Sequence, residues 1–238
     1  MLQGTITFKT RIKSKGVRFP LVEFNSNKPG VGKVEIEAPN GFEIVATVHL
    51  ASVASRDEAR KLAAEVHVTA LDRIVFKHGV GIENPECTGE QYSPPVEVYA
   101  VANVGTRVGL VTGIEPTQLK AELEQVSLPG EHNYSLFRSA RQSQSPTEEF
   151  MHLHNILLMI FNDKQRDVEA FIMSEDPATP QTQHPLKPPG VMETVYTKLR
   201  NELGHKRAGV NVDKTKSQMA ERLDGLIALT KRAIELHP

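Results

Sequence analysis

Hydrophobic and polar residues alternate with a period of two along the first part of the chain, as they do in β-strands with one buried face. Four such stretches are rich in β-branched and aromatic residues and are separated by turn sequences at 25–30 and 39–41. They predict strands at 5–12, 17–24, 34–38 and 42–50. Two later stretches, 96–104 and 107–112, predict a closing hairpin.

The period then changes to that of a helix. Ser55 and Glu58 have the spacing of a capping box, in which each side chain accepts a free backbone N–H of the first turn. Hydrophobic residues follow at helical spacing, at Leu62, Val66, Ala70 and Ile74. They predict one long helix over 56–77, ended by the glycines at 79 and 81.

Helical spacing dominates the second half of the chain. The pattern predicts helices at 116–126 and 167–173, and a further helix that begins after Ser145. Ser145, Pro146 and Glu148 form its start signal. One face of this helix holds five side chains that should pack inward: Phe150, Leu153, His154, Leu157 and Phe161.

Proline shapes the segment that follows. Residues 174–190 contain five prolines in 17 residues, which predicts an extended, helix-free insertion. A helix with hydrophobic residues from Met192 to Leu203 should end near Gly204. A last helix should begin near Thr215, which has capping-box spacing to Gln218.

These elements predict an α+β protein with two domains. Residues 1–113 would form a β-rich accessory domain with one long helix. Residues 114–238 would form an all-α helical bundle that carries the Pro-rich insertion at 174–190. The boundary is expected within 113–130, because the helix after the prolines needs the helix before them as a packing partner.

Composition narrows the functional classes. The 238 residues hold 28 Lys plus Arg against 29 Asp plus Glu, a net charge of −1 that argues against a wholly basic nucleic-acid binder. The longest apolar run, 156–161, is far shorter than the ~20 residues of a membrane-spanning helix. The N-terminus lacks the apolar stretch of a secretory signal, and the single cysteine suits a reducing compartment. We therefore expect a cytoplasmic protein without membrane contact.

Basic residues nevertheless gather in two places. Residues 1–20 hold five and no acid, and 196–217 hold six against two acids, a net charge of +4. Such clusters can meet phosphates, although strand edges and helix ends also carry solvated lysines and arginines.

The second cluster contains the most informative motif, Arg200 and Asn201 followed by His205. At ~100° per residue, Asn201 and His205 lie ~40° apart on one helix face, whereas Arg200 and His205 lie ~140° apart. A single straight helix therefore does not aim both at one atom. Two copies across a symmetric interface could do so, as could a helix that frays at Gly204.

This motif resembles that of the HEPN family (higher eukaryotes and prokaryotes nucleotide-binding). Its signature is an Arg, four to six residues and a His, often with a polar residue directly after the Arg. The order of elements is also similar, with a helix over 146–161, a Pro-rich insertion, the motif helix and a terminal amphipathic helix. Residues 140–150 look like the start of the first long helix in a bacterial subgroup. That subgroup joins a β-rich domain to a HEPN domain and includes methylamine-utilisation protein J-like proteins.

The resemblance implies a metal-independent endoribonuclease that needs no cofactor. The ribose 2′-hydroxyl attacks the adjacent phosphate and leaves a 2′,3′-cyclic phosphate. The catalytic residues would be Arg200, Asn201 and His205, and Lys198, Lys206 and Arg207 would bind RNA. A histidine can transfer protons near neutral pH, and an arginine fork can hold phosphate oxygens. The resemblance also implies a homodimer or a larger assembly, in a toxin or anti-phage defence setting.

Other readings stay open. Many HEPN members keep the fold without cleavage, so a non-catalytic dimerisation, nucleotide-binding or assembly module is the alternative. His152 and His154 could suggest a metal-dependent hydrolase, but residues i and i+2 point ~160° apart on a helix, so we predict no metal site. We expect His154 to be a hydrogen-bonded core residue or, less favoured, to face the Arg200 helix. Cys87 has no base nearby in sequence and is expected to be inert.

Overall fold

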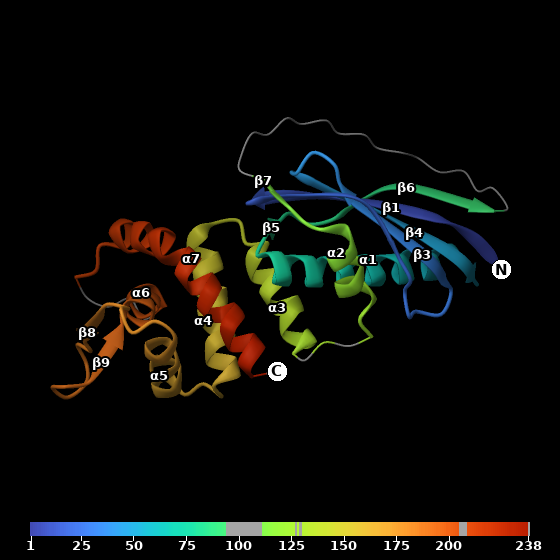
Figure 1. The fold of residues 1–238 in the computed structure, drawn as a ribbon. Coiled ribbons are helices and arrows are strands. Elements are labelled where there is room, and N and C mark those ends of the chain that lie inside the picture. Colours follow the sequence, from blue (N-terminus) through green and yellow to red (C-terminus); the bar gives the residue numbers. More distant parts are fainter. Residues whose placement is uncertain (94–110, 127, 129, 205–208, 238) are drawn as a thin grey trace. The chain divides into compact units, whose positions relative to one another are not determined.

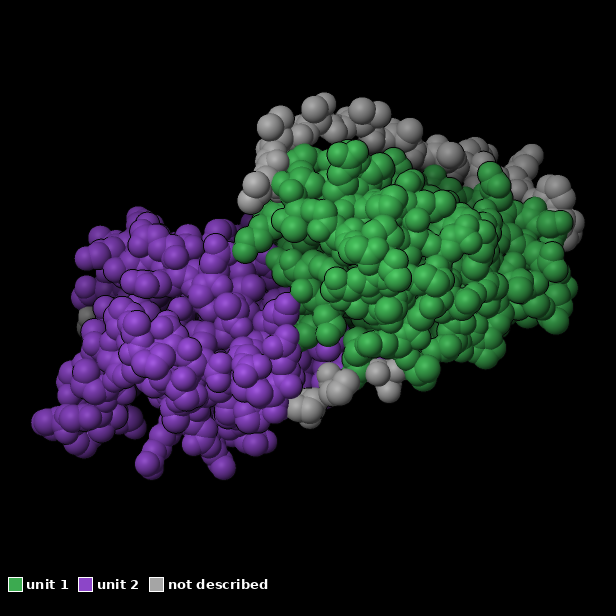
Figure 2. All heavy atoms as spheres, viewed as in Figure 1, with its two compact units in different colours: residues 1–128 green, residues 129–238 purple. Residues whose placement is uncertain are grey.

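The computed structural model describes residues 1–93, 111–126, 128, 130–204 and 209–237. The protein is of mixed α and β type, as predicted. The chain forms two compact units, residues 1–128 and 129–238, which are coloured separately in Figure 2. None of the helices in the described part of the chain has the length and apolar character needed to cross a membrane.

A curled sheet of seven strands, counted over the described residues, makes up most of the first unit (Figure 1). Its strand order is β5-β1-β4-β3-β2-β7, and β6 also pairs with β1. All four strands predicted before residue 51 are present. The strands are β1 (Leu2–Ser14), β2 (Gly16–Phe24), β3 (Val31–Ala38), β4 (Glu43–Val53), β5 (Gly81–Ile82), β6 (Glu86–Ser93) and β7 (Val111–Gly113).

Side chains alternate between the two faces of this sheet. Ile6, Phe8 and Ile12 of β1 are buried, and so are the matching residues Ala46 and Val48 of β4, which pairs with β1 in antiparallel register. Helix α1 (Arg56–His78) covers this apolar face. Its Ala59, Ala63, Val66, Ala70 and Ile74 are buried. The predicted period of two in the strands and of 3.6 in the helix therefore reflects one shared core.

The ends of α1 follow the predicted signals. The Ser55 side chain accepts the Glu58 N–H at 3.2 Å, and Glu58 accepts the Ala54 N–H in return at 2.6 Å. Gly79 ends the helix with a φ of 68°, a left-handed conformation that glycine adopts at little cost.

Two features of the first unit differ from the sequence expectation. The hairpin expected over 96–104 and 107–112 lies largely outside the described residues, and the described part, β7, pairs in parallel with β2. Helix α2 (Pro116–Glu124), expected in the helical domain 114–238, packs on β2 of the first unit. Arg73 of α1 also donates to the carbonyl oxygens of Glu122 and Leu123, at 3.3 and 2.6 Å. An amphipathic pattern marks an apolar face but does not say which core it covers.

The second unit is built mainly from helices. Helix α4 packs against α3, α6 and α7, and α6 also packs against α7. The start of α4 is the predicted capping box, with the Glu148 N–H donating to Ser145 Oγ at 3.2 Å. The helices are α3 (Glu131–Arg141), α4 (Pro146–Ile160), α5 (Gln165–Glu175), α6 (Val195–Gly204) and α7 (Val212–Leu236).

The second unit is not all-α as predicted, because part of the Pro-rich insertion forms a hairpin. Strands β8 (Gln181–Gln183) and β9 (Met192–Thr194) pair in antiparallel register. The Gln183 side chain donates to the Pro188 carbonyl at 3.0 Å and accepts the Gly190 N–H at 2.9 Å. Proline has no backbone N–H to donate. The Gln183 side chain therefore supplies hydrogen bonds in this turn that backbone groups would otherwise make.

Helix positions also differ from the prediction. The helix expected from Met192 begins only at Val195, because Met192–Thr194 pair with β8 as strand β9. Helix α3 had no predicted counterpart, and α7 begins earlier than expected. The Asn211 side chain, not that of Thr215, caps α7 by accepting the Lys214 N–H at 3.0 Å. The Thr215 hydroxyl instead donates to Glu202 on α6 at 2.7 Å. Both residues are good caps in isolation, and the tertiary contact with Glu202 decides between them.

Candidate functional site

Helix α6 carries the described part of the predicted site. Tyr196 and Leu199 of α6 are buried in the helical core, which fixes the rotation of the helix about its axis. Asn201 lies on the same inward side and is only 7% exposed, whereas Arg200 is half-buried. His205, Lys206 and Arg207 of the predicted site lie outside the described residues.

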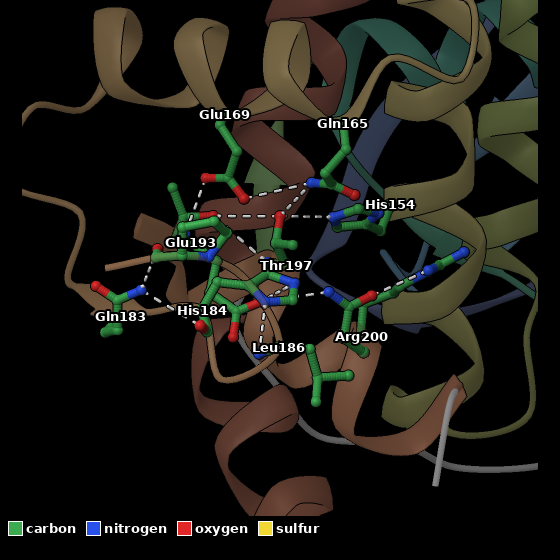
Figure 3. A network of polar contacts seen from close by, with 12 residues as sticks. His154, Gln165, Glu169, Gln183, His184, Leu186, Glu193, Thr197 and Arg200 are labelled. Carbon is green, nitrogen blue, oxygen red and sulfur yellow. Dashed lines mark hydrogen bonds and ion pairs between the residues drawn. The ribbon is translucent and has the colours of Figure 1, made fainter. Parts of the chain in front are cut away.

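Arg200 and Asn201 belong to a chain of polar contacts that reaches the β8–β9 hairpin (Figure 3). Arg200 Nη1 donates to Asn201 Oδ1 at 3.0 Å. Asn201 Nδ2 in turn donates to Glu193 Oε2 at 3.3 Å. Two adjacent residues of the predicted motif are therefore joined directly, and a carboxylate stands behind them.

Glu193 belongs to this site, although the sequence pattern did not predict it as a site residue. It lies on β9 and is 2% exposed. His184 Nε2, from the segment that follows β8, lies 3.8 Å from the same Oε2 atom. Burying a carboxylate is costly unless it is paired, so its burial beside an amide donor and an imidazole marks it as part of the site. The sequence pattern gave no signal for Glu193, because it falls within the helix predicted from Met192, whereas in the structure Met192–Thr194 form β9 and the helix begins at Val195.

A second group of polar residues lies one turn before Asn201 on the buried side of α6, around Thr197. Its hydroxyl lies 3.3 Å from His154 Nε2 and accepts from Gln165 Nε2 at 2.7 Å. Glu169 of α5 then accepts the Thr194 backbone N–H at 2.8 Å. These contacts attach the motif helix and β9 to α4 and α5, as the close-up in Figure 3 shows.

His154 is the buried histidine that the helical pattern predicted. Its side chain is fully buried and hydrogen-bonded to Thr197 on the Arg200 helix. Burial lowers the pKa of His154 to about 3, and the positive charge of nearby Arg200 contributes in the same direction. His154 is therefore neutral at physiological pH and cannot accept a proton from a substrate there.

Lys198 is the remaining described member of the predicted RNA-binding set. It lies on α6, with its Nζ atom 3.6 Å from Glu202 Oε1, and its side chain is 34% exposed. An ion pair this exposed contributes little to stability, so the ammonium group can reach a phosphate at small cost.

The N-terminal basic cluster has a different character. Lys9 lies 3.3 Å from Glu43, and Arg11 lies 4.0 Å from Glu83. Both pairs line a small surface pocket that also contains the exposed Cys87. Basic side chains paired in this way on a strand face are typical of solvated sheet surfaces.

The metal reading gains no support in the part of the chain that the structure describes. No group of three or more His, Cys, Asp or Glu side chains could hold a metal ion there. His152 Nδ1 lies 3.1 Å from Ser143 Oγ, whereas His154 bonds to Thr197. The two histidines thus have separate partners, as their i, i+2 spacing predicted.

The described site is thus an arginine, an amide and a buried carboxylate in series, next to a neutral buried histidine. A scan of protein-family models, a search of curated proteins and a search of solved structures found no match to this chain.

Proposed function

We propose that the protein is a metal-independent endoribonuclease of the HEPN type, with Arg200, Asn201 and His205 as its catalytic residues. The observation that supports the proposal is the Arg200–Asn201 contact at 3.0 Å, with Asn201 itself backed by Glu193. An arginine whose fork is held in one orientation is suited to phosphate oxygens, because little side-chain freedom remains to be lost on binding.

Each proposed residue has a chemical role. The Arg200 guanidinium would oppose the negative charge that grows on the phosphate oxygens in the transition state. His205 would take the proton of the 2′-hydroxyl or give one to the leaving 5′-oxygen. Asn201 would orient the guanidinium, and Lys198 would contact a neighbouring phosphate together with Lys206 and Arg207. His154, being neutral and buried, has no proton-transfer role in this scheme.

Cleavage of RNA in the presence of EDTA tests the proposal directly. The expected products carry 2′,3′-cyclic phosphate and 5′-hydroxyl ends. R200A and H205A should each lower kcat by ~100-fold or more, the usual cost of losing one group that stabilises transition-state charge. R232A is the matched control, because Arg232 is half-exposed and paired with Glu175 at 3.2 Å on the surface of the same unit. Full activity in R200A and H205A would refute the proposal.

One observation favours the alternative of a non-catalytic binding or assembly module. Asn201 is nearly fully buried and uses both ends of its amide for contacts within the protein. A motif of this kind can also serve only to hold the hairpin on α6. In that case the wild-type protein cleaves no RNA under any activating condition, and N201A lowers the stability of the protein.

The proposal extends to partners and setting. A homodimer through the second unit would allow Arg200 of one copy and His205 of the other to share a phosphate, which a single straight helix does not. Sedimentation equilibrium measures the association, and mixed dimers of R200A with H205A subunits test the sharing by restored cleavage. A cytoplasmic toxin or anti-phage defence role, in which RNA is the target, belongs to the same proposal and predicts growth arrest on expression that R200A relieves.

A further inference from the structure

We infer that Glu193 is a positioning residue for Arg200 and acts through Asn201. This inference rests on the proposed nuclease function, in which Arg200 holds the phosphate. It assigns a role to the Pro-rich hairpin, which then belongs to the active site and is not merely a connection between helices. The hairpin places the buried carboxylate of Glu193 against the Asn201 amide.

The orientation of the Asn201 amide follows from its two neighbours. A guanidinium can only donate hydrogen bonds, and an ionised carboxylate can only accept them. Arg200 Nη1 must therefore face Asn201 Oδ1, at 3.0 Å, and Glu193 Oε2 must face Asn201 Nδ2, at 3.3 Å. If the carboxylate is removed, the Asn201 amide keeps only its contact with Arg200, and one of the two contacts that fix its position is lost.

Glu193 is in turn held firmly. Its side chain is 2% exposed, and the next residue, Thr194, is anchored by its backbone N–H to Glu169 Oε2 at 2.8 Å. His184 Nδ1 accepts the Leu186 backbone N–H at 3.2 Å, so in the neutral ring Nε2 carries the proton and faces Glu193. The carboxylate thus accepts one hydrogen bond from Asn201 on α6 and has the His184 ring of the hairpin 3.8 Å away.

A swap of donor and acceptor tests the arrangement. N201D keeps the acceptor for Arg200 but sets one carboxylate against another, so kcat should fall ~10- to 100-fold with little change in KM. E193Q alone should cost less than ~3-fold, because the Gln oxygen can still accept from Asn201. The double variant E193Q/N201D restores a donor opposite the new carboxylate, and its kcat should return to within ~3-fold of wild type. If the double variant is as inactive as N201D, the inference is wrong.

A second readout does not depend on catalysis. The side-chain ¹⁵N signals of Arg200, assigned with R200K, should shift or broaden in E193A, because the Asn201 amide can then turn. E175A is the matched control: it removes a carboxylate of the same unit that pairs with Arg232 at 3.2 Å and takes no part in holding Glu193, so the Arg200 signals should stay as in wild type. Unchanged Arg200 signals in E193A would overturn the inference.

The two readouts separate the two proposals. If wild-type protein cleaves no RNA while E193A still alters the Arg200 signals, the nuclease proposal fails and the positioning role stands. If cleavage occurs but E193A leaves both kcat and the Arg200 signals unchanged, the nuclease proposal stands and the role of Glu193 fails.

Discussion

Individual side chains around α6 divide into groups that can reach a ligand and groups that hold others in place. Arg200 and Lys198 are partly exposed, whereas Asn201, Glu193 and His154 are buried. Buried polar groups are stable only when they are hydrogen-bonded, and each of these three has a partner on another element or on the adjacent residue. The buried polar side chains of the second unit therefore hold the partly exposed residues of α6 in place.

His154 gives the second unit a pH-dependent stability. Its pKa is about 3 in the folded protein against an ordinary value of 6.5, so between these values the unfolded chain binds a proton that the folded chain does not. Stability is therefore complete above about pH 6.5 and falls as the pH drops towards 3. The loss between pH 7 and pH 4 should be on the order of 3 kcal/mol, at ~1.4 kcal/mol per unit of pKa difference.

Guanidinium denaturation followed by circular dichroism measures this dependence, since the chain has no tryptophan to report by fluorescence. H154Q can keep a hydrogen bond to Thr197 but does not titrate. Its curve of unfolding free energy against pH should be flatter than that of wild type over this range. Parallel curves for the two proteins would show that His154 does not carry the effect.

At the scale of elements, the contact between α6 and α7 depends on a glycine, Gly225, which has no side chain. A Cβ atom at Gly225 of α7 would lie 2.3 Å from the phenol oxygen of Tyr196 on α6. Tyr196 is 4% exposed, so its ring has little room to move away. Gly225 thus allows the motif helix to approach α7 closely, and the position of Arg200 depends on this approach.

G225A should therefore destabilise the second unit by about 1–3 kcal/mol, the usual cost of overpacking. In a helix without this neighbour, the same change would stabilise by up to about 1 kcal/mol. G225A in a Y196F background removes the clashing oxygen and should recover most of the loss. Thermal unfolding of the two single variants and the double variant measures the coupling, and additive effects would contradict it.

The β8–β9 hairpin shows a related dependence between elements. Its sequence has the composition of a linker, yet the side chain of Gln183 closes the turn and Glu193 enters the core. Gly190 adopts a φ of 90° at this turn, a conformation that other residues rarely take. The element is stable because of the helices around it, and it contributes one residue to their site.

At the scale of the whole molecule, the chain consists of two units with separate cores. All described residues of the candidate site belong to residues 129–238, and the curled sheet with α1 and α2 forms the other unit. The net charge of −1 is an average over both and says little about the local charge near Arg200.

We expect residues 129–238, expressed alone, to fold cooperatively and to retain RNA cleavage. The physical reason is that the helical core and the described site residues all lie within this unit. Circular dichroism and the EDTA cleavage assay measure both properties against the full chain. A fragment that folds but does not cleave, while the full chain does, would show that the first unit contributes to the site.

Much of the secondary structure was predictable because it depends on local sequence. The strands before residue 51 follow a period of two, and the starts of α1 and α4 follow capping boxes at Ser55 and Ser145. Helix α3 was missed because its buried residues include Asn133 and Arg141, whose polar character hides the apolar face. Strand β6 was missed because its sequence has few β-branched residues and its pairing with β1 supplies the stability.

The candidate site was predictable only in part. Arg200 and Asn201 were identified from their motif, and their contact in the structure agrees with a shared role, but His205 lies outside the described residues. The contribution of Glu193 and His184 to the site could not be inferred, because neither residue is part of the Arg200–Asn201–His205 motif. Hydrogen-bond partners across a hairpin depend on how the chain folds back, which no local pattern encodes.

The sequence by itself determined the period of the strands before residue 51, the capped starts of α1 and α4 and the motif that suggests a chemistry, because these depend on neighbours within one or two turns of the chain. The tertiary structure alone decided that α2 covers the sheet, that Asn211 and not Thr215 caps α7, and that a buried carboxylate from a Pro-rich hairpin stands behind Arg200. Each of these outcomes is set by contacts between residues far apart in sequence, where burial makes a hydrogen-bond partner obligatory.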